Sequence, residues 1–254
     1  MINGIKPNYG MAVETGEGIY WVGYNYRTIF HTNPYLVVDG AEAVLIDPGS
    51  SVDFFAVRAK IAQIIPISKI YHIVLHHQDP DLCGSTRQFE IAIGHDIGVY
   101  NPERSSFFAH FYGIKTPIVK ISEDGHKLKF GNGRVLRFYM TPYCHAPGAM
   151  ITYDEKTQTV FTSDIYGAFN KKWELYHDWI GEEKHRETVK MFMDPYMGSK
   201  EAILSAADKL AALKIKTICP QHGSIIRNNI PEWINALKKM EYGRALNEQI
   251  KWWR

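Results

Sequence analysis

The alternation of apolar runs and turn residues along the chain predicts a mixture of strands and helices. Residues 18–25, 34–40 and 41–50 are short apolar runs separated by Gly, Asp and Asn, a pattern typical of successive β-strands. Residues 51–65 place apolar side chains on one face, which predicts an amphipathic helix. Residues 69–77 form an apolar run that ends in two histidines, as expected of a buried strand. The end of such a strand is where α/β sheets usually carry their chemistry.

The second half of the chain continues the same mixture. Further strand candidates cover residues 96–101, 133–140, 148–154, 159–166 and 216–223. Residues 200–213 predict a helix, and another begins near Pro231. The chain has no internal repeat, low-complexity tract or long linker, so we expect a single domain over residues 1–254. These elements predict an α/β fold, and two sheets sandwiched between helices would fit, although periodicity alone does not select this layering.

The composition indicates the general class of the protein and its expected compartment, but it does not indicate a function. The chain has 254 residues, of which 45% are hydrophobic and 22% charged, as is ordinary for a soluble protein with a sizeable core. Its formal net charge of +2 gives no argument for nucleic acid or a membrane surface as a partner. We find no long apolar run and no export signal, and three cysteines do not suggest a disulfide framework. We therefore expect a cytoplasmic protein.

A cluster of possible metal ligands follows the run at 69–77. Residues 76–81 contain two histidines and two aspartates, and alternate positions His77, Asp79 and Asp81 could converge from a strand end or a tight loop. Imidazole and carboxylate groups together can hold a divalent transition metal. Three later segments show one polar residue beside small or turn residues after an apolar run, and they supply His145, Asp164 and His222.

Each of these later residues is a weak signal by itself. A lone His or Asp after a strand is more often a helix cap or a hydrogen-bonded core residue. Six ligand-type side chains at four separate strand ends are harder to explain in this way. Together they predict a shared metal site.

The order and spacing of these motifs resemble the metallo-β-lactamase superfamily, in particular the di-iron domain of flavodiiron proteins. That family carries His-x-Glu-x-Asp-His, then a distant His, an Asp and a final His. The flanking segments IYWVG, NPYLVVDG with VLIDPG, CGS and PQHG also have counterparts there. The resemblance covers roughly residues 17–245. It implies an αββα sandwich that binds two metal ions.

The resemblance also implies a role for each ligand. One metal would take His77, Asp79 and His145, the other would take Asp81 and His222, and Asp164 would bridge the two. A bridging carboxylate makes chemical sense because it offsets the repulsion between two nearby cations.

Two positions depart from the family pattern. Asp79 stands where flavodiiron proteins usually have Glu and hydrolases of the superfamily have His. A carboxylate there favours iron, although zinc also accepts carboxylates and stays an alternative. Leu82 replaces the His that normally completes the second metal. That metal would bind more weakly or keep an open position, or only one metal would be held.

The chain is also too short for the flavodoxin-like domain of flavodiiron proteins, so we expect no flavin and no built-in electron donor. This resembles the short oxygen-binding di-iron proteins, some of which are linked to chemotaxis. The expected function is dioxygen binding for sensing, with weak reduction of oxygen or nitric oxide left open. Expected partners are dioxygen and a signalling protein or external electron donor, and a homodimer is compatible with the resemblance. A zinc-dependent hydrolase of lactones or thioesters, and a remnant without metal, are the alternatives.

Neighbouring residues complete the hypothesis. His76, Tyr143 and Tyr166 are candidates for orienting ligands, although we expect His76 to point away from His77. Residues 103–115 are expected to form a packed surface helix, and residues 171–187 a rim over the metals. The rim would use Trp173, Tyr176 and Trp179, whereas Cys83, Cys144 and Cys219 are expected to be buried structural residues.

Overall fold

The computed structural model describes residues 6–24 and 29–243, and the chain divides into two compact units. Unit 1 comprises Met1–Tyr26, His31–Ile121 and Lys129–Arg134, and unit 2 comprises Arg27–Phe30, Ser122–Leu128 and Val135–Arg254. Each unit carries one sheet and its own helices, which confirms the predicted α/β class. The expectation of a single domain stays a prediction.

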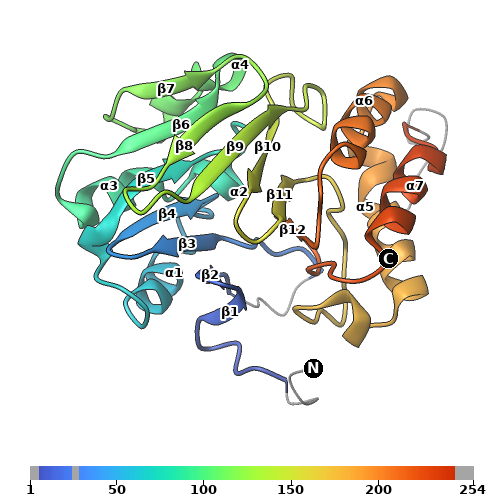
Figure 1. Ribbon diagram of the computed structural model, residues 1–254, viewed down its shortest axis with the longest axis horizontal. Helices are drawn as coiled ribbons and strands as arrows, with labels where there is room; N and C mark the ends of the chain where they lie inside the picture. Colours follow the sequence, from blue (N-terminus) through green and yellow to red (C-terminus); the bar gives the residue numbers. More distant parts are fainter. Residues whose placement is uncertain (1–5, 25–28, 244–254) are drawn as a thin grey trace. The chain divides into compact units, whose positions relative to one another are not determined.

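Unit 1 contains a seven-stranded sheet whose spatial order follows the sequence (Figure 1). Its strands are β1 (Val13–Gly16), β2 (Ile19–Trp21), β3 (Tyr35–Asp39), β4 (Glu42–Ile46), β5 (Ile70–Val74), β6 (Gly98–Pro102) and β7 (Ile118–Ile121). Pairs from β1 to β4 are antiparallel, and pairs from β4 to β7 are parallel. The connections contain α1 (Phe54–Ile61), η1 (Ile67–Lys69), α2 (Pro80–Cys83), α3 (Thr86–Ile93), α4 (Glu103–Ser106) and η2 (Ala109–Tyr112).

The core of unit 1 follows from strand and helix periodicity. Ala43 and Leu45 of β4 point to the same face because successive side chains alternate across a strand. They share a fully buried cluster with Val57 and Ile61 of α1 and with Phe89 of α3. Burying the Leu, Val, Ile and Phe side chains of this cluster stabilises the unit by roughly 1.5–3 kcal/mol each. The parallel strands β4, β5 and β6 are thereby held with their carboxyl ends at one edge.

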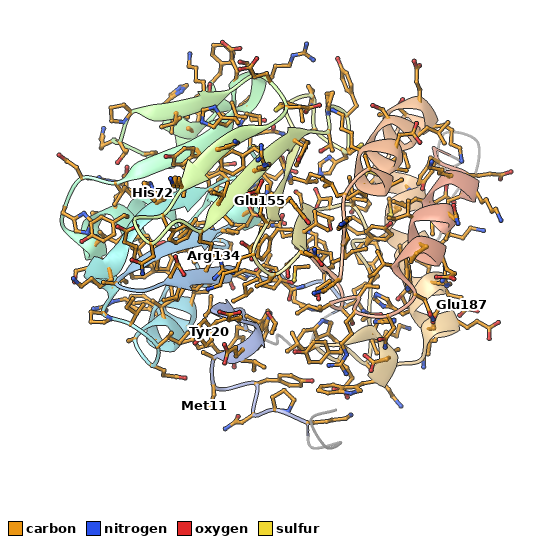
Figure 2. All side chains as sticks on the ribbon, in the orientation of Figure 1. Met11, Tyr20, His72, Arg134, Glu155 and Glu187 are labelled. Atoms are coloured by element: carbon orange, nitrogen blue, oxygen red, sulfur yellow. The ribbon has the colours of Figure 1, made fainter. Side chains whose placement is uncertain are left out.

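The turn at residues 129–134, between two segments of unit 2, also belongs to unit 1. Arg134, labelled in Figure 2, is buried and donates hydrogen bonds to the carbonyl groups of Glu17 and Val38 at 3.1 and 3.0 Å. The backbone N–H of Gly131 donates to the Glu42 carboxylate at 2.9 Å. These bonds tie residues 129–134 to β3 and β4.

Unit 2 contains a five-stranded sheet in the order β12-β11-β10-β9-β8 (Figure 1). The strands are β8 (His126–Lys129), β9 (Val135–Met140), β10 (Met150–Asp154), β11 (Thr159–Ser163) and β12 (Thr217–Pro220). Strands β9, β10 and β11 are antiparallel, whereas β11 and β12 are parallel. The helices are η3 (His177–Trp179), α5 (Glu182–Tyr196), α6 (Lys200–Ala211) and α7 (Ile230–Lys239).

The helices of unit 2 bury apolar stripes at helical spacing. Val189, Phe192 and Met193 of α5 lie three and four residues apart, and α7 contributes Trp233 and Leu237. These side chains share one buried cluster with apolar residues of α6, β10, β11 and β12. The cluster fixes the two adjacent strand ends that follow β11 and β12.

Most predicted elements are confirmed, with differences at particular segments. The helix predicted over 51–65 forms over Phe54–Ile61. The single surface helix predicted over 103–115 is wrong, because the segment forms two short helices, α4 and η2, with Phe107 and Phe108 between them. Its phenylalanines give no packed stripe: Phe107 and Phe111 are 64% and 75% exposed. Strands β1, β7 and β8 and helices α3 and α5 were not predicted. In the described part of the chain, no helix is long and apolar enough to cross a membrane.

Candidate metal centre

In unit 1, the ligand candidates follow β5 directly. His77 is 1% exposed, and its Nε2 lies 3.5 Å from Oδ2 of Asp79, whose side chain is 31% exposed. Pro80 takes the first position of α2, where its missing N–H costs nothing, so the extended chain turns into a helix immediately after Asp79. Asp81 falls in the first turn of α2 and is half-buried. The fold therefore brings His77 and Asp79 together and places Asp81 beside them in the chain.

The backbone around His77 is held from two sides. Its carbonyl group accepts hydrogen bonds from Nδ2 of Asn101 and from the Cys83 thiol, both at 3.2 Å. His76 contacts Asp47 instead, with 2.5 Å between Nδ1 and Oδ2, and its backbone N–H donates to the same carboxylate. Asp47 follows β4, which is parallel to β5, so both residues lie at the same sheet edge. This pair fixes the direction in which the two adjacent histidines leave the strand.

Leu82 occupies the position where the family pattern has a ligand histidine. Its side chain is fully buried in the core of unit 1, in the same cluster as Leu75 and Phe89. It supplies no metal-binding atom. Any metal that uses Asp81 therefore has one imidazole fewer than in the family pattern.

In unit 2, a single buried carboxylate faces two histidines. Oδ2 of Asp164 lies 3.0 Å from Nε2 of His145, and Oδ1 of Asp164 lies 3.3 Å from Nε2 of His222. The side chains of Asp164 and His222 are each 2% exposed, whereas that of His145 is 25% exposed. Each oxygen of one carboxylate is thus directed to a different imidazole, as a bridging carboxylate requires.

Strand pairing explains why Asp164 and His222 meet. They follow β11 and β12, which are parallel neighbours, and the N–H of Gln221 donates to the carbonyl of Ser163 at 2.8 Å. Gly223 then turns the chain at φ +86°, where a Cβ atom would lie 2.7 Å from that of Ala168. Only glycine fits this turn without strain.

Aromatic side chains surround the buried histidine of this set. The ring of Phe30 stacks on that of His222 at a centroid distance of 4.1 Å, and Phe192 lies 5.5 Å away. Trp173, predicted as part of a rim, donates its indole N–H to the carbonyl of Gly223 at 2.7 Å. These groups make the surroundings of His222 largely apolar.

The other predicted neighbours have different partners. Tyr176 and Trp179 pack around Arg227, whose guanidinium lies 3.8 Å from the Tyr176 ring centroid. Tyr166 is fully buried against Trp233, at a centroid distance of 6.1 Å. The backbone N–H of Tyr143 donates to the carbonyl of Ala146 at 2.7 Å, which closes the turn that carries His145.

The backbone is strained next to the ligands of unit 2. Ser163, Tyr143 and Tyr166 have φ values of +53°, +65° and +70°. These values lie in the left-handed region, which residues other than glycine rarely adopt. Such conformations cost about 1–3 kcal/mol each and cluster at functional sites. Their position beside His145 and Asp164 supports a functional role for this edge.

The cysteines are buried, as predicted. Burial, followed by the negative charges of Asp47, Asp81 and Asp79, raises the pKa of Cys83 well above its ordinary value. Burial likewise raises the pKa of Cys144 to about 12. Burial thus favours the thiol over the thiolate form of both residues, as is typical of structural cysteines.

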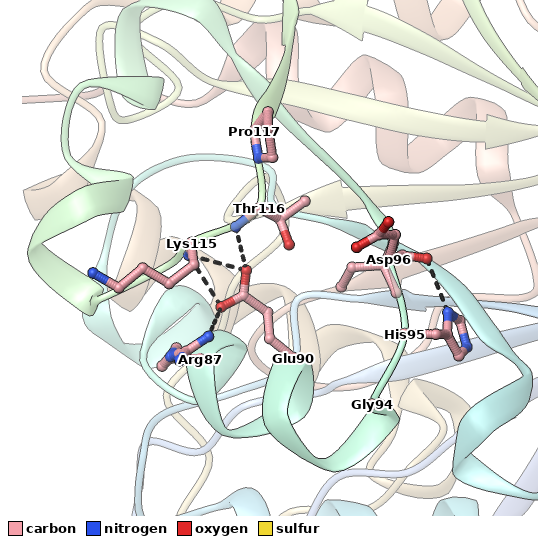
Figure 3. A pocket seen from close by; sticks show the side chains of 9 residues that line it. Arg87, Glu90, Gly94, His95, Asp96, Lys115, Thr116 and Pro117 are labelled. Atoms are coloured by element: carbon pink, nitrogen blue, oxygen red, sulfur yellow. Dashed lines mark hydrogen bonds and ion pairs between the residues drawn. The ribbon is translucent and has the colours of Figure 1, made fainter.

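A pocket of about 400 Å³ lies at the amino-terminal ends of β6 and β7, away from the ligand candidates of unit 1 (Figure 3). Glu90 accepts the N–H groups of Lys115 and Thr116 at 3.1 and 2.8 Å and an N–H of Arg87 at 3.1 Å. Burial opposes the charge of Glu90, but these hydrogen bonds outweigh it and lower its pKa. This carboxylate therefore fixes the loop that contains Lys115 and Thr116. The loop lies at the opposite edge of the sheet from His77, which follows the carboxyl end of β5.

The donor set of both units fits transition-metal chemistry. Neutral imidazole nitrogen and carboxylate oxygen are the ligands used for non-haem iron, and zinc also accepts them. Three carboxylates would offset much of the charge of two divalent ions. Sequence reasoning did not single out Asp47, Asn101 and Phe30. Asp47 could have been found, because it is an aspartate directly after a predicted strand, like Asp164.

The comparisons with known proteins identify relatives that match most of the chain. The family model described as ODP family beta lactamase matches residues 30–223. The chain is 26% identical to an uncharacterized protein, MJ0732, of Methanocaldococcus jannaschii, over 94% of this chain and 63% of that protein. It is 28% identical to the flavo-diiron protein FprA2 of Clostridium acetobutylicum, over 86% of this chain and 54% of that protein. The chain thus spans under two thirds of the length of these relatives.

Solved structures match the fold. The apo state of the chemotaxis sensor ODP from T. denticola gives a TM-score of 0.76 at 23% identity, covering 92% of this chain and 95% of that one. A structure described as the peroxy diiron species of chemotaxis sensor ODP gives 0.80 at 23% identity, covering 93% and 97%. Rubredoxin oxygen:oxidoreductase from Desulfovibrio gigas gives 0.81 at 21% identity, covering 90% and 61%. These matches confirm the predicted metallo-β-lactamase-like fold.

Proposed function

Because the chain belongs to the ODP family of beta-lactamase-fold proteins, we propose that it is a non-haem di-iron protein that binds dioxygen and serves as an oxygen sensor in signalling such as chemotaxis. The observation that carries the proposal is the arrangement around Asp164, whose two oxygens each face a different histidine. A carboxylate held in this way is suited to join two metal ions.

The ligand assignment is part of the proposal. The first iron takes His77, Asp79 and His145, the second takes Asp81 and His222, and Asp164 bridges them. The 3.5 Å separation of His77 Nε2 and Asp79 Oδ2 supports the first group, because two ligand atoms on one metal lie at about this spacing. The second iron is the weaker one, because buried Leu82 leaves it without a further histidine.

The residues of the chain would bind the two metal ions, orient the ligand side chains and shield the site from water. Two ferrous ions, when bound, would supply the electrons that a dioxygen ligand takes up. His222 is held against Phe30 and Phe192, which exclude water from its ring. Exclusion of water strengthens electrostatic interactions inside a site. The missing ligand at Leu82 leaves a coordination position for the gas.

Sensing is favoured over reductase activity by the relatives. The family model that matches residues 30–223 is that of the ODP family, and solved structures of a chemotaxis sensor ODP share the fold. We propose a signalling protein as the partner and slow turnover at most with an external electron donor. Cytoplasmic localisation and a homodimer belong to the same proposal.

Anaerobic purification followed by metal analysis and exposure to oxygen tests this function. We expect about two iron ions per chain and new charge-transfer bands in the visible spectrum when oxygen is added. Two zinc ions in their place, or an iron-loaded protein whose spectrum does not respond to oxygen, would contradict the proposal and favour a zinc hydrolase. Steady oxygen consumption with an added reductant would favour a reductase over a sensor.

A further inference from the structure

The two oxygens of Asp79 have different surroundings. Oδ2 lies 3.5 Å from Nε2 of His77. Oδ1 accepts a hydrogen bond of 2.9 Å from Nε2 of Gln78, the residue between them in the chain. The carboxylate can only accept, so the side-chain NH₂ of Gln78 must be the group that faces it. One oxygen is therefore engaged by an amide, and the other points toward the histidine.

Gln78 is itself held at two points. The hydroxyl of Ser105 donates to Oε1 of Gln78 at 2.9 Å, which fixes the side-chain amide in the orientation that presents its NH₂ to Asp79. The hydroxyl of Tyr112 donates to the backbone carbonyl of Gln78 at 2.5 Å. Ser105 belongs to α4 and Tyr112 to η2, so both bonds come from one segment, residues 103–112.

We propose that Gln78 is a positioning residue for the metal site. It occupies Oδ1 of Asp79 and leaves Oδ2 as the single metal-binding oxygen. The inference rests on the proposed function, because it takes Asp79 and His77 as ligands of one metal. Asp79 needs such support because its side chain is 31% exposed and would otherwise rotate toward solvent or bind through both oxygens. Outer hydrogen bonds of this kind orient ligands and tune metal affinity.

The surface segment 103–112 thereby becomes part of the support of a ligand. Its outer side carries the exposed rings of Phe107, Phe108 and Phe111. Its inner side holds Gln78 through Ser105 and Tyr112. Any displacement of this segment would change the orientation of Asp79.

The test replaces Gln78 with Met, which keeps the length of the side chain but neither donates nor accepts a strong hydrogen bond. We expect metal affinity, measured by competitive titration of the apo protein with Co²⁺, to fall about 10- to 100-fold. We also expect the visible spectrum of bound Co²⁺ to change, because Asp79 would be free to bind through both oxygens. Ser105→Ala should shift both readouts in the same direction by less.

Gln88→Met is the matched control. Gln88 lies on α3, and its side-chain oxygen meets no hydrogen-bond donor in the described ranges. If Gln78→Met has the Co²⁺ affinity and the spectrum of the wild type, the inference is overturned. If the wild type binds metal, the proposed function still stands. A wild type that binds no metal would overturn both. If Gln78→Met fails to fold, as judged by circular dichroism, Ser105→Ala decides: an unchanged Co²⁺ spectrum and affinity overturn the inference.

Discussion

The two units build their ligand sets in different ways. In unit 1 all three candidates, His77, Asp79 and Asp81, come from one short stretch after β5. In unit 2 the three candidates His145, Asp164 and His222 follow three different strands. The first set is shaped by local turns and by Pro80 at the start of α2, whereas the second exists only when the sheet has formed.

Burial separates the two sets as well. The carboxylate of Asp164 is 2% exposed and faces two histidines, while that of Asp79 is 31% exposed and lies 3.5 Å from Nε2 of His77. The difference teaches that the buried carboxylate of Asp164 is held in place by the fold of its sheet, whereas the more exposed carboxylate of Asp79 is held by a few hydrogen bonds. Removing one or the other should therefore have unequal consequences.

The largest effect is expected from Asp164→Asn, which keeps the shape but removes the charge that faces both histidines. We expect metal analysis of the purified protein to show loss of both ions, because a neutral amide does not offset the repulsion between two cations. Asp178→Asn, which removes an exposed carboxylate paired with Arg227, should keep both. Two retained ions in Asp164→Asn would refute the bridging role.

A smaller loss is expected from Asp79→Asn. Asp79 is assigned to one metal only, so we expect the protein to keep the ion held by Asp81, Asp164 and His222, or the first ion in weakened form. Metal analysis and Co²⁺ titration should give about one ion per chain, against about two for wild type. Complete loss of metal, as for Asp164→Asn, would show that the two sets do not differ in the way proposed.

The core of unit 2 should also impose an acid limit on stability. Burial, followed by the charges of His177 and Arg186, lowers the pKa of fully buried His185 to about 3. Between this pH and the unfolded value of about 6.5, the unfolded chain takes up a proton that the folded chain does not. The contribution of neutral His185 to the free energy of unfolding is therefore fully present above pH 6.5. It is lost as the pH falls from 6.5 towards the folded pKa, by about 1.4 kcal/mol for each pH unit.

Urea unfolding from pH 7 to pH 4 checks this dependence. His185→Phe removes the titrating group at similar volume, so its stability should fall less steeply with acid. His110→Phe, at an exposed position of η2, should keep the wild-type slope. Equal slopes in wild type and His185→Phe would contradict the assignment.

The smallest effect is expected at the turn after His222. Gly223→Ala forces a residue with a side chain into φ +86° and brings its Cβ against Ala168, so we expect a loss of about 1–3 kcal/mol. Gly94→Ala has a similar φ of +76° but open space around it, and should cost only about 1 kcal/mol. Thermal unfolding followed by circular dichroism measures both, and equal losses would show that the contact with Ala168 is unimportant.

The ligand candidates of unit 1 were easier to predict from the sequence than those of unit 2. Residues 76–81 were recognisable as a cluster because ligand-type residues fall within one loop, and the structure brings His77 and Asp79 together. His145, Asp164 and His222 were recognisable only as residues after strands. Their proximity depends on the parallel pairing of β11 with β12, which spacing does not reveal. The ligand roles came from the resemblance and stay proposals.

Supporting residues were the hardest to predict. Phe30 stacks on His222, and Ser105 holds Gln78, through contacts between remote parts of the chain. The periodicity of one segment carries no information about such partners. Helix α5 was missed for a related reason, because its first half is charged and its buried stripe begins only at Val189, apart from His185.

The turn at residues 129–134 has a consequence for synthesis on the ribosome. It completes unit 1 through Arg134 and Gly131, although it follows a segment of unit 2 in the chain. The carbonyl of Val38 and the carboxylate of Glu42 therefore wait for partners made some ninety residues later. At roughly 5–20 residues per second, β3 and β4 remain without these partners for several seconds. Until residues 131–134 have been made, water has to satisfy these two acceptors of the amino-terminal sheet.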